Sequence, residues 1–406
     1  MANNQGLNRN LILGGVAVLV LLIAVFYFLG PKSKSNVKSG KNADSGMSKT
    51  TDPTDNTKSG KDGTGVSGDT ASEYGVTPEF LLEQYKEWAQ YPPNSRPITN
   101  NNHDLVQPFF VMESPLELVD DPKDKEVNGY RCHFQPKTWA VIGPNAEMFI
   151  KLECRDKTNQ PVPVKITDHK MFREDMDAKK YSALRADFND DGRDGDEVAK
   201  DNIITFKWKP LKTDWGQMTL EADIAYGQGK KAKVTSTFFS SPNKPAEVTN
   251  VFRESTNDGS LIIHATVNVL KAGNYHLEAN LKEAKEKNYI AYSTFDGSLK
   301  SGTNEVEFLF FGKILKDKGY DGPYIVTDVR GHRVNLAVDP AWFSQGEEGL
   351  KKIQAAKTTE PDKELVLPFT DEYKTKPYQI SVFSNKEWAS ADKENRIKEL
   401  QALSQK

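Results

Sequence analysis

The densest group of chemically capable side chains is an acidic run from Asp187 to Glu197. Side-chain oxygens recur there at alternate positions and a glycine follows, as in the first half of a calcium-binding loop. Calcium accepts about six to eight oxygen ligands in flexible geometry. The pattern predicts a structural Ca²⁺ site whose ligands are Asp187, Asn189, Asp191, Arg193 (through its carbonyl), Asp196 and Glu197.

The same run can also be interpreted as a solvated turn. Asp, Asn and Gly tolerate left-handed backbone conformations and hydrogen-bond their own backbone. The position that supplies a bidentate glutamate in calcium loops is Val198 in this chain. Both interpretations stay open from the sequence. In either case the loop has a structural role and leads into a strand predicted at 203–208.

The two cysteines of the chain, Cys132 and Cys154, are the next candidates. A sparse, even count favours one structural disulfide in an oxidising compartment, and two buried free thiols are the alternative. Cys154 lies on the apolar face of a predicted strand, so we expect a bridge between neighbouring strands. It would close a loop of about 20 residues, for which the chain-entropy model gives about 3 kcal/mol.

No catalytic constellation is evident. The six histidines do not have the spacing of a zinc protease, and neither a nucleophile elbow nor a phosphate-binding loop is present. Cys132 and His133 are adjacent, but neighbouring strand residues point to opposite faces. The net charge of −3 gives no nucleic-acid footprint. We therefore expect no enzymatic activity, no nucleic-acid partner and no small-molecule substrate.

The segment 11–29 is uncharged and apolar on every helical face. At about 1.5 Å per residue it is long enough to cross a bilayer, and Gly30-Pro31 would end the helix. A cleaved signal peptide is the alternative, but it needs a shorter apolar core and small residues at the cleavage site. The sequence therefore predicts a single-pass anchor in the cytoplasmic membrane.

The orientation of this anchor is set by opposing signals. Arg9 precedes it, whereas four lysines follow between Lys32 and Lys41, which by the positive-inside rule favours a cytoplasmic body. A large body behind an N-terminal span is instead the usual signal-anchor layout, and the body's composition fits an extracytoplasmic space. We expect the body to be periplasmic or extracellular.

The pattern divides the 406 residues into seven segments. These are an N-terminal tail (1–10), the transmembrane helix (11–29), a polar linker expected to be disordered (30–75), a helical and extended lead-in (76–104), two strand-rich modules (105–242 and 243–340) and a C-terminal extension with a terminal helix (341–406).

Alternation with period two dominates both modules. Met148, Ile150, Leu152 and Cys154 alternate with Phe149, Lys151 and Glu153, and similar runs follow at 204–208, 218–224, 234–238, 263–269, 275–281 and 306–310. These patterns predict half-buried antiparallel strands. The expected fold class is mainly β: two immunoglobulin-like β-sandwich modules with short flanking helices. The helices are expected after Thr77 and after the N-cap Ser390.

Parts of this pattern resemble a known family. The run Asp191-Gly192, Gly195-Asp196, Ala199 and Asp201 resembles the acidic loop of bacterial choice-of-anchor X type surface proteins, although Lys200 and Asn202 stand where that family tends to have glycines. A second match comprises Gly273-Asn274-Tyr275, Leu299, Gly302, 306–312 and Asp321-Gly322-Pro323-Tyr324. The resemblance implies immunoglobulin-like modules without enzymatic activity.

The sequence thus predicts an anchored bacterial envelope protein with a non-catalytic binding or scaffolding role and a protein partner at the envelope. Two other functions stay open: an envelope enzyme or enzyme accessory with a site built from loops, and a cytoplasm-facing component of a secretion or motility machine.

Overall fold

The computed structural model describes residues 77–111, 115–119, 127–175, 178–335, 341–342, 345–356 and 360–405. The chain separates into two compact units, 1–77 with 338–356, and 78–337 with 357–406. In the described part of the first unit, α5 (Gly346–Ala355) is the regular element. The predicted transmembrane segment 11–29 lies outside the described residues. Within the described ranges no helix has both the length and the apolarity needed to span a membrane.

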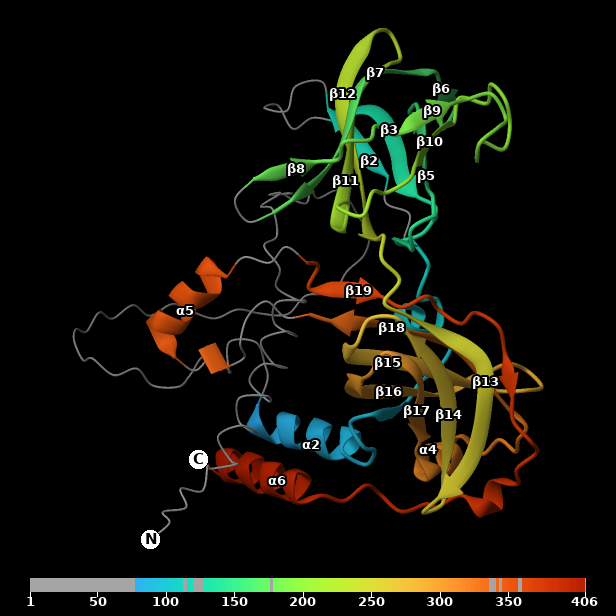
Figure 1. Ribbon diagram of the computed structural model, residues 1–406, viewed down its shortest axis with the longest axis vertical. Coiled ribbons are helices and arrows are strands. Elements are labelled where there is room, and N and C mark those ends of the chain that lie inside the picture. Colours follow the sequence, from blue (N-terminus) through green and yellow to red (C-terminus); the bar gives the residue numbers. More distant parts are fainter. Residues whose placement is uncertain are drawn as a thin grey trace, which may run out of the picture. The chain divides into compact units, whose positions relative to one another are not determined.

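The second unit is mainly β, and two of its sheets enclose one core (Figure 1). The first sheet contains β2 (Leu116–Val119), β3 (Val127–Pro136), β5 (Met148–Arg155), β10 (Ile204–Trp208) and β9 (Asp187–Asn189) in this order, with β6 (Pro161–Val162) paired to β5. The second contains β4 (Ala140–Ile142), β12 (Lys230–Ser241), β11 (Gly216–Tyr226), β7 (Val164–Glu174) and β8 (Lys179–Tyr181).

Two further sheets enclose a second core. One contains β1 (Ser95–Pro97), β16 (Tyr289–Leu299), β15 (Gly273–Glu283), β18 (Tyr324–Val334) and β19 (Lys363–Leu365), with β20 (Tyr373–Lys374) paired to β18. The other contains β13 (Ala246–Asn257), β14 (Ser260–Val269) and β17 (Gly302–Phe310). The remaining short elements are α3 (His103–Val106), α4 (Gly312–Lys318) and the 3₁₀ helix η3 (Ile380–Val382).

The predicted strand faces are confirmed where they are apolar. In β5 the side chains of Met148, Ile150, Leu152 and Cys154 are buried and their neighbours are half-exposed. The same alternation holds for the apolar residues of β11, β12, β14, β15 and β17. Mainly-β structure therefore follows directly from the period-two pattern.

Several side chains expected on exposed faces are buried instead. Thr205 and Asn280 are fully buried, and His264 is nearly so. Asn280 is covered because Leu105 of α3 lies over it and accepts a hydrogen bond from Asn280 Nδ2 at 2.7 Å. A second layer supplied by distant chain segments therefore covers faces that the alternation alone assigns to solvent.

The lead-in and the C-terminal extension both add strands to the second core's larger sheet. β1 pairs with β16 through Ser95 and Ser293, and β19 pairs with β18 through Leu365 and His332. These strands are too short to show a period-two pattern in the sequence. The sheet is consequently completed by residues far away in the chain.

The two longer flanking helices pack against each other. α2 (Pro78–Trp88) and α6 (Ala391–Ser404) lie side by side (Figure 1). The predicted N-cap is confirmed, since the Ser390 side chain accepts a hydrogen bond from the Lys393 amide at 3.1 Å. The sequence predicted helices after Thr77 and Ser390, and the structure shows that these two helices pack on each other.

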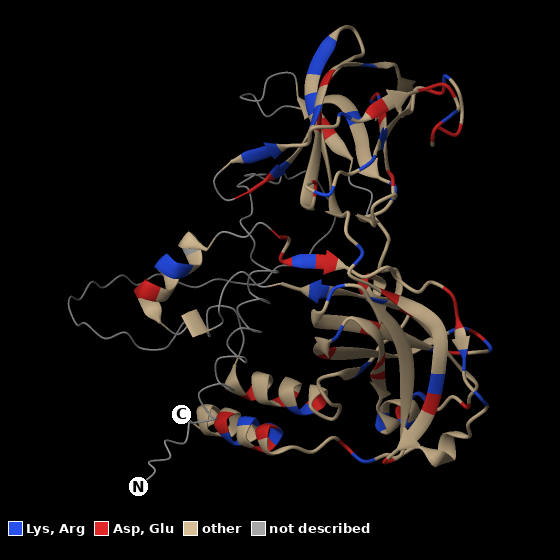
Figure 2. Ribbon diagram, viewed as in Figure 1, with Lys and Arg blue, Asp and Glu red and all other residues tan. Residues whose placement is uncertain are grey.

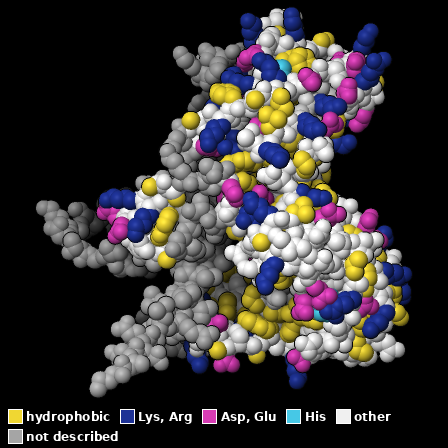
Figure 3. Space-filling model, in the orientation of Figure 1, with side chains coloured by type: hydrophobic (Ala, Val, Ile, Leu, Met, Phe, Trp, Pro, Cys, Tyr) yellow, Lys and Arg dark blue, Asp and Glu magenta, His cyan; other side chains and the backbone are white. Residues whose placement is uncertain are grey.

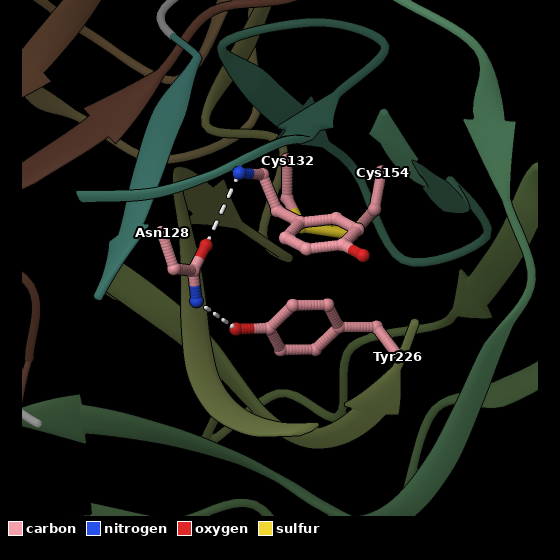
Figure 4. Close-up of a disulfide and its surroundings, with 5 residues drawn as sticks. Asn128, Cys132, Cys154 and Tyr226 are labelled. Atoms are coloured by element: carbon pink, nitrogen blue, oxygen red, sulfur yellow. Dashed lines mark hydrogen bonds between the residues drawn. A yellow bond between two sulfur atoms is a disulfide. The ribbon is translucent and has the colours of Figure 1, made fainter. Parts of the chain in front are cut away.

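The predicted disulfide is confirmed. Cys132 and Cys154 are opposite each other on β3 and β5, with Cα atoms 4.0 Å apart and both residues fully buried. Beside the bridge, Asn128 Nδ2 donates to the Tyr226 hydroxyl at 2.9 Å (Figure 4). The bridge thus joins neighbouring strands inside the first core.

Replacing both cysteines (Cys132→Ala with Cys154→Ala) should lower the free energy of unfolding by about 3 kcal/mol or more, because the unfolded chain regains the entropy of an open loop. Urea unfolding followed by tryptophan fluorescence measures this change. Wild-type protein under reducing conditions is the matched control, since it loses the bond but keeps both sulfur atoms. An unchanged free energy of unfolding in both samples would contradict the prediction.

Candidate functional site

The acidic run forms β9 and the first part of the loop between β9 and β10, where the ribbon carries several Asp and Glu positions (Figure 2). β9 pairs with β10 through Asp187 and Lys207, Phe188 and Phe206, and Asn189 and Thr205. This antiparallel pairing fixes both ends of the loop. The intervening chain therefore has to return on itself, which brings its carboxylates together.

Three carboxylates converge in this loop. Asp190, Asp196 and Asp201 each place one oxygen within 4.8 Å of the others, and Asp196 is buried. Each also accepts a backbone hydrogen bond: Asp196 Oδ2 from Gly192, Asp190 Oδ1 from Asp201 and Asp201 Oδ1 from Ile203. These bonds fix the orientation of the three side chains. We call Asp190, Asp196 and Asp201 the aspartate triad.

Of the six ligands predicted from the sequence, only Asp196 lies in the aspartate triad. The Asp187 side chain is exposed on β9. With the amide oriented by its hydrogen bonds, the Asn189 nitrogen donates to Asp191 Oδ1 at 3.1 Å and to the Arg193 carbonyl at 3.3 Å. Asp191 and Arg193 thus make hydrogen bonds within the loop and are not among the three converging carboxylates.

Strand lysines pair with other acidic residues of the loop. Lys151 Nζ lies 2.8 Å from Glu197 Oε1, and this hydrogen bond lowers the pKa of the glutamate. Lys207 Nζ lies 3.1 Å from Asp194 Oδ1, a hydrogen bond that raises the pKa of the lysine. Such exposed pairs contribute little to stability, but they pair Glu197 and Asp194 with lysines of the neighbouring strands.

The loop needs several left-handed residues. Gly195 has φ of 94°, and a Cβ there would lie 2.2 Å from the Phe149 ring, so only glycine fits. Lys200 and Asn202 adopt φ of 61° and 67°. They thus take the left-handed conformation that glycine favours. The sequence did not predict Asp190 and Asp201 as ligands, because they approach Asp196 only through this left-handed backbone path.

A second polar cluster lies on β15 and β18, and the sequence analysis did not identify it. His276 and His332 face each other in register, with ring centroids 5.4 Å apart. Glu278 accepts from His276 Nε2 at 3.0 Å and pairs with Arg330 Nε at 2.8 Å. His276 Nδ1 also contacts Asp296 Oδ1 at 2.7 Å. Only strand pairing could reveal this cluster, because its members are far apart in the sequence.

The environment shifts the pKa of each central member. Burial favours the neutral form of Glu278, but the hydrogen bond from His276 and the charge of Arg330 outweigh it and hold the pKa at about 2. The hydrogen bond to Glu278 raises the pKa of His276. Burial, reinforced by the charge of Lys363, lowers the pKa of His332 to about 3. The pKa values of the two facing histidines are therefore shifted in opposite directions, upward for His276 and downward for His332.

On the face that Figure 3 shows, Lys and Arg side chains are intermingled with Asp and Glu side chains. A surface of this kind lacks the basic stripe that would attract a nucleic-acid backbone there. The aspartate triad and the cluster on β15 and β18 are therefore the candidate functional sites.

Comparison with known proteins gives distant similarities. No protein-family model and no curated protein matches the chain. Among solved structures, it is similar to a DUF4785 family protein from Legionella pneumophila subsp. pneumophila, with 13% identity and a TM-score of 0.36, over 63% of this chain and 58% of that one. It is also similar to the secreted serine protease VesC from Vibrio cholerae (9% identity, TM-score 0.16, over 52% of this chain and 48% of that one) and to Sidekick-1 immunoglobulin domains 1–5 (9% identity, TM-score 0.17, over 54% and 45%). Similarities this weak assign neither family nor activity.

His332→Gln should make the protein less sensitive to acid between pH 6.5 and 4.5. The unfolded chain binds a proton at His332 near pH 6.5, whereas the folded chain binds it only near pH 3. Stability is therefore lost as the pH falls, by up to about 1.4 kcal/mol per pH unit for one proton. Urea midpoints measured across this range test the slope.

Two neighbouring groups define the best pH window for that measurement. Glu278 stabilises the fold above its ordinary value of 4.5 and loses this contribution only as the pH falls toward 2. His276 contributes stability that is present below its unfolded pKa and lost as the pH rises through its folded value. His103→Gln, at an exposed position, is the control for removing a histidine. A slope unchanged by His332→Gln would contradict the prediction.

Proposed function

We propose that this protein is a membrane-anchored component of a bacterial envelope with a non-catalytic binding or scaffolding role. Segment 11–29 serves as the anchor, and two immunoglobulin-like β-sandwich modules carry the binding surfaces. The two separate cores, each enclosed by paired sheets, support the modular part of this proposal. The resemblance to choice-of-anchor X type surface proteins is a further argument for it.

The observation that carries the proposal is the buried bridge between Cys132 and Cys154. Structural disulfides persist in oxidising compartments and are rare where thiols are kept reduced. The lysines at 32–41 favour the opposite orientation. The bridge carries more weight for this proposal, because a buried structural disulfide reflects the compartment of the folded body itself, whereas the lysines only bias the insertion of the anchor.

Thiol labelling in cells tests the orientation. Because both native cysteines are bridged, Ser59→Cys provides a single reactive thiol in the segment that follows the anchor. A membrane-impermeant maleimide should label it in intact spheroplasts. Asn4→Cys, on the other side of the anchor, is the matched control and should react only after lysis. The reverse pattern would place the body in the cytoplasm and favour a cytoplasm-facing machine component.

A second candidate function is structural calcium binding by the acidic loop. The aspartate triad favours it, because three carboxylates held close together repel one another and a divalent cation relieves that repulsion. Asp190, Asp196 and Asp201 would hold the ion, with backbone carbonyls or water completing its oxygen shell. The bound ion would supply no chemistry beyond stiffening the connection into β10.

Calcium at millimolar concentration should raise the melting temperature, and Asp190→Asn combined with Asp201→Asn should abolish the rise. Differential scanning calorimetry with and without calcium measures both. Asp187→Asn is the matched control, since Asp187 lies outside the triad. Loss of the effect in that control, with the double variant responding normally, would favour the ligands predicted from the sequence. If calcium does not raise the melting temperature of the wild-type protein, the loop is only a turn.

A further inference from the structure

A cavity of about 240 Å³ lies over the outer face of the sheet that contains β15, β18 and β19. Its polar wall contains Glu278, Arg330, His332 and Lys363, and its apolar wall includes Phe109 and Trp139. These residues come from five separate stretches of the chain. The cavity is smaller than the roughly 300–1,000 Å³ of sites for drug-sized ligands, so a ligand that fits it is small.

Strand register places the polar wall on one face. His276 is opposite His332, and Glu278 is opposite Arg330, while Leu365 of β19 is opposite His332. Lys363, two residues before Leu365, therefore points to the same side. Arg333 and Glu364 pair on the other face at 3.0 Å. The cationic group of β19 is consequently directed into the cavity by the geometry of the sheet.

Lys363 has no anionic partner among the described residues. No hydrogen bond or ion pair joins its ammonium to another side chain, and its Nζ lies 6.0 Å from the centroid of the Phe239 ring, at the outer limit of a cation–π contact. Burial lowers the pKa of Lys363, which the charges of Glu278 and Asp362 only partly oppose. A half-buried ammonium without a partner is unfavourable until an anion joins it.

The nearby carboxylates do not fill this role. Both oxygens of Glu278 are already used, one by His276 and the other by Arg330. Asp104 and Asp362 are exposed side chains at the edge of this region. The cavity thus contains a positive charge whose neighbouring acids are paired elsewhere or solvated.

Trp139 provides a second unsatisfied donor. It lines the cavity, and its buried Nε1–H has no hydrogen-bond partner in the described part of the chain. Buried donors without acceptors are uncommon in folded proteins and point to a missing acceptor. Trp139 and the unpaired ammonium of Lys363 line the same cavity. This combination suits a ligand that has a flat apolar body and anionic oxygens.

We propose that this cavity binds a small organic carboxylate. Its carboxylate accepts hydrogen bonds from Lys363 and Trp139, and its apolar or aromatic body packs against Phe109 and Leu365. The chemistry is shared by free aromatic acids and by the carboxyl end of a peptide chain. This inference goes beyond the proposed envelope role and does not depend on the compartment, the anchor or the aspartate triad.

Isothermal titration calorimetry of the full chain in lipid nanodiscs tests the proposal with benzoate as the probe and empty nanodiscs as the blank. Saturable one-to-one binding is expected, with benzamide, the neutral analogue, binding at least tenfold more weakly. A tetrapeptide ending in phenylalanine, with a free or an amidated carboxyl end, then distinguishes a chain end from a free acid. Equal binding of benzoate and benzamide, or no saturable binding of benzoate at millimolar concentration, would overturn the proposal.

Matched variants separate the two donors from general effects on the fold. Lys363→Met should weaken benzoate binding at least tenfold, whereas Lys300→Met, at an exposed position, should leave it unchanged. Trp139→Phe keeps an aromatic ring but removes the N–H, and should weaken binding several-fold. Circular dichroism confirms that each variant is folded. Unchanged binding in folded Lys363→Met protein would refute the role of the lysine.

Proton uptake provides an independent readout. Because binding favours the charged form of Lys363, titrations above neutral pH in buffers of different ionisation enthalpy should show protons taken up with benzoate. The uptake should disappear in Lys363→Met. Binding without proton uptake in the wild-type protein would place the carboxylate away from Lys363.

Discussion

The antiparallel register of β15 between β16 and β18 determines the two faces of the largest sheet in the second core. It directs Tyr275, Leu277, Ala279 and Leu281 into the apolar core. By the same alternation, His276 and Glu278 lie on the opposite face, across from His332 and Arg330. A slip of one residue would exchange the two sets and bury charged groups in the core. Core packing and the polar wall of the cavity are therefore consequences of one constraint.

The two polar clusters satisfy their charges differently. In the acidic loop, backbone amides donate hydrogen bonds to the aspartate triad, and strand lysines pair with Glu197 and Asp194. The three carboxylates of the triad stay close together. At the cavity, Glu278 is fully paired and the unpaired charge is the cation of Lys363. The loop accordingly suits a cation, and the cavity suits an anion.

The first core depends on the sheet around the disulfide. Cys132 and Cys154 are buried among apolar side chains. Nearby, the Asn128 side chain on β3 donates to the Tyr226 hydroxyl on β11 and accepts a hydrogen bond from the Tyr130 amide of β3. Because β5 pairs with both β3 and β10, the bridged strand also supports the strand that ends the acidic loop. The disulfide and the acidic loop are thus connected through β5, which carries Cys154 and pairs with β10.

The sequence by itself determined the features that depend on local patterns. Period-two alternation identified the apolar face of β5, the even cysteine count predicted the bridge, and Ser390 marked the start of α6. Tertiary structure decided which distant residues meet. Asp190 and Asp201 approach Asp196 only because β9 and β10 pair and Lys200 turns left-handed. Lys363 and His332 line the same cavity only because β19, from the C-terminal extension, pairs with β18. Alternation specifies which face a side chain occupies, whereas strand order and backbone path, which specify its neighbours, leave no periodic trace in the sequence.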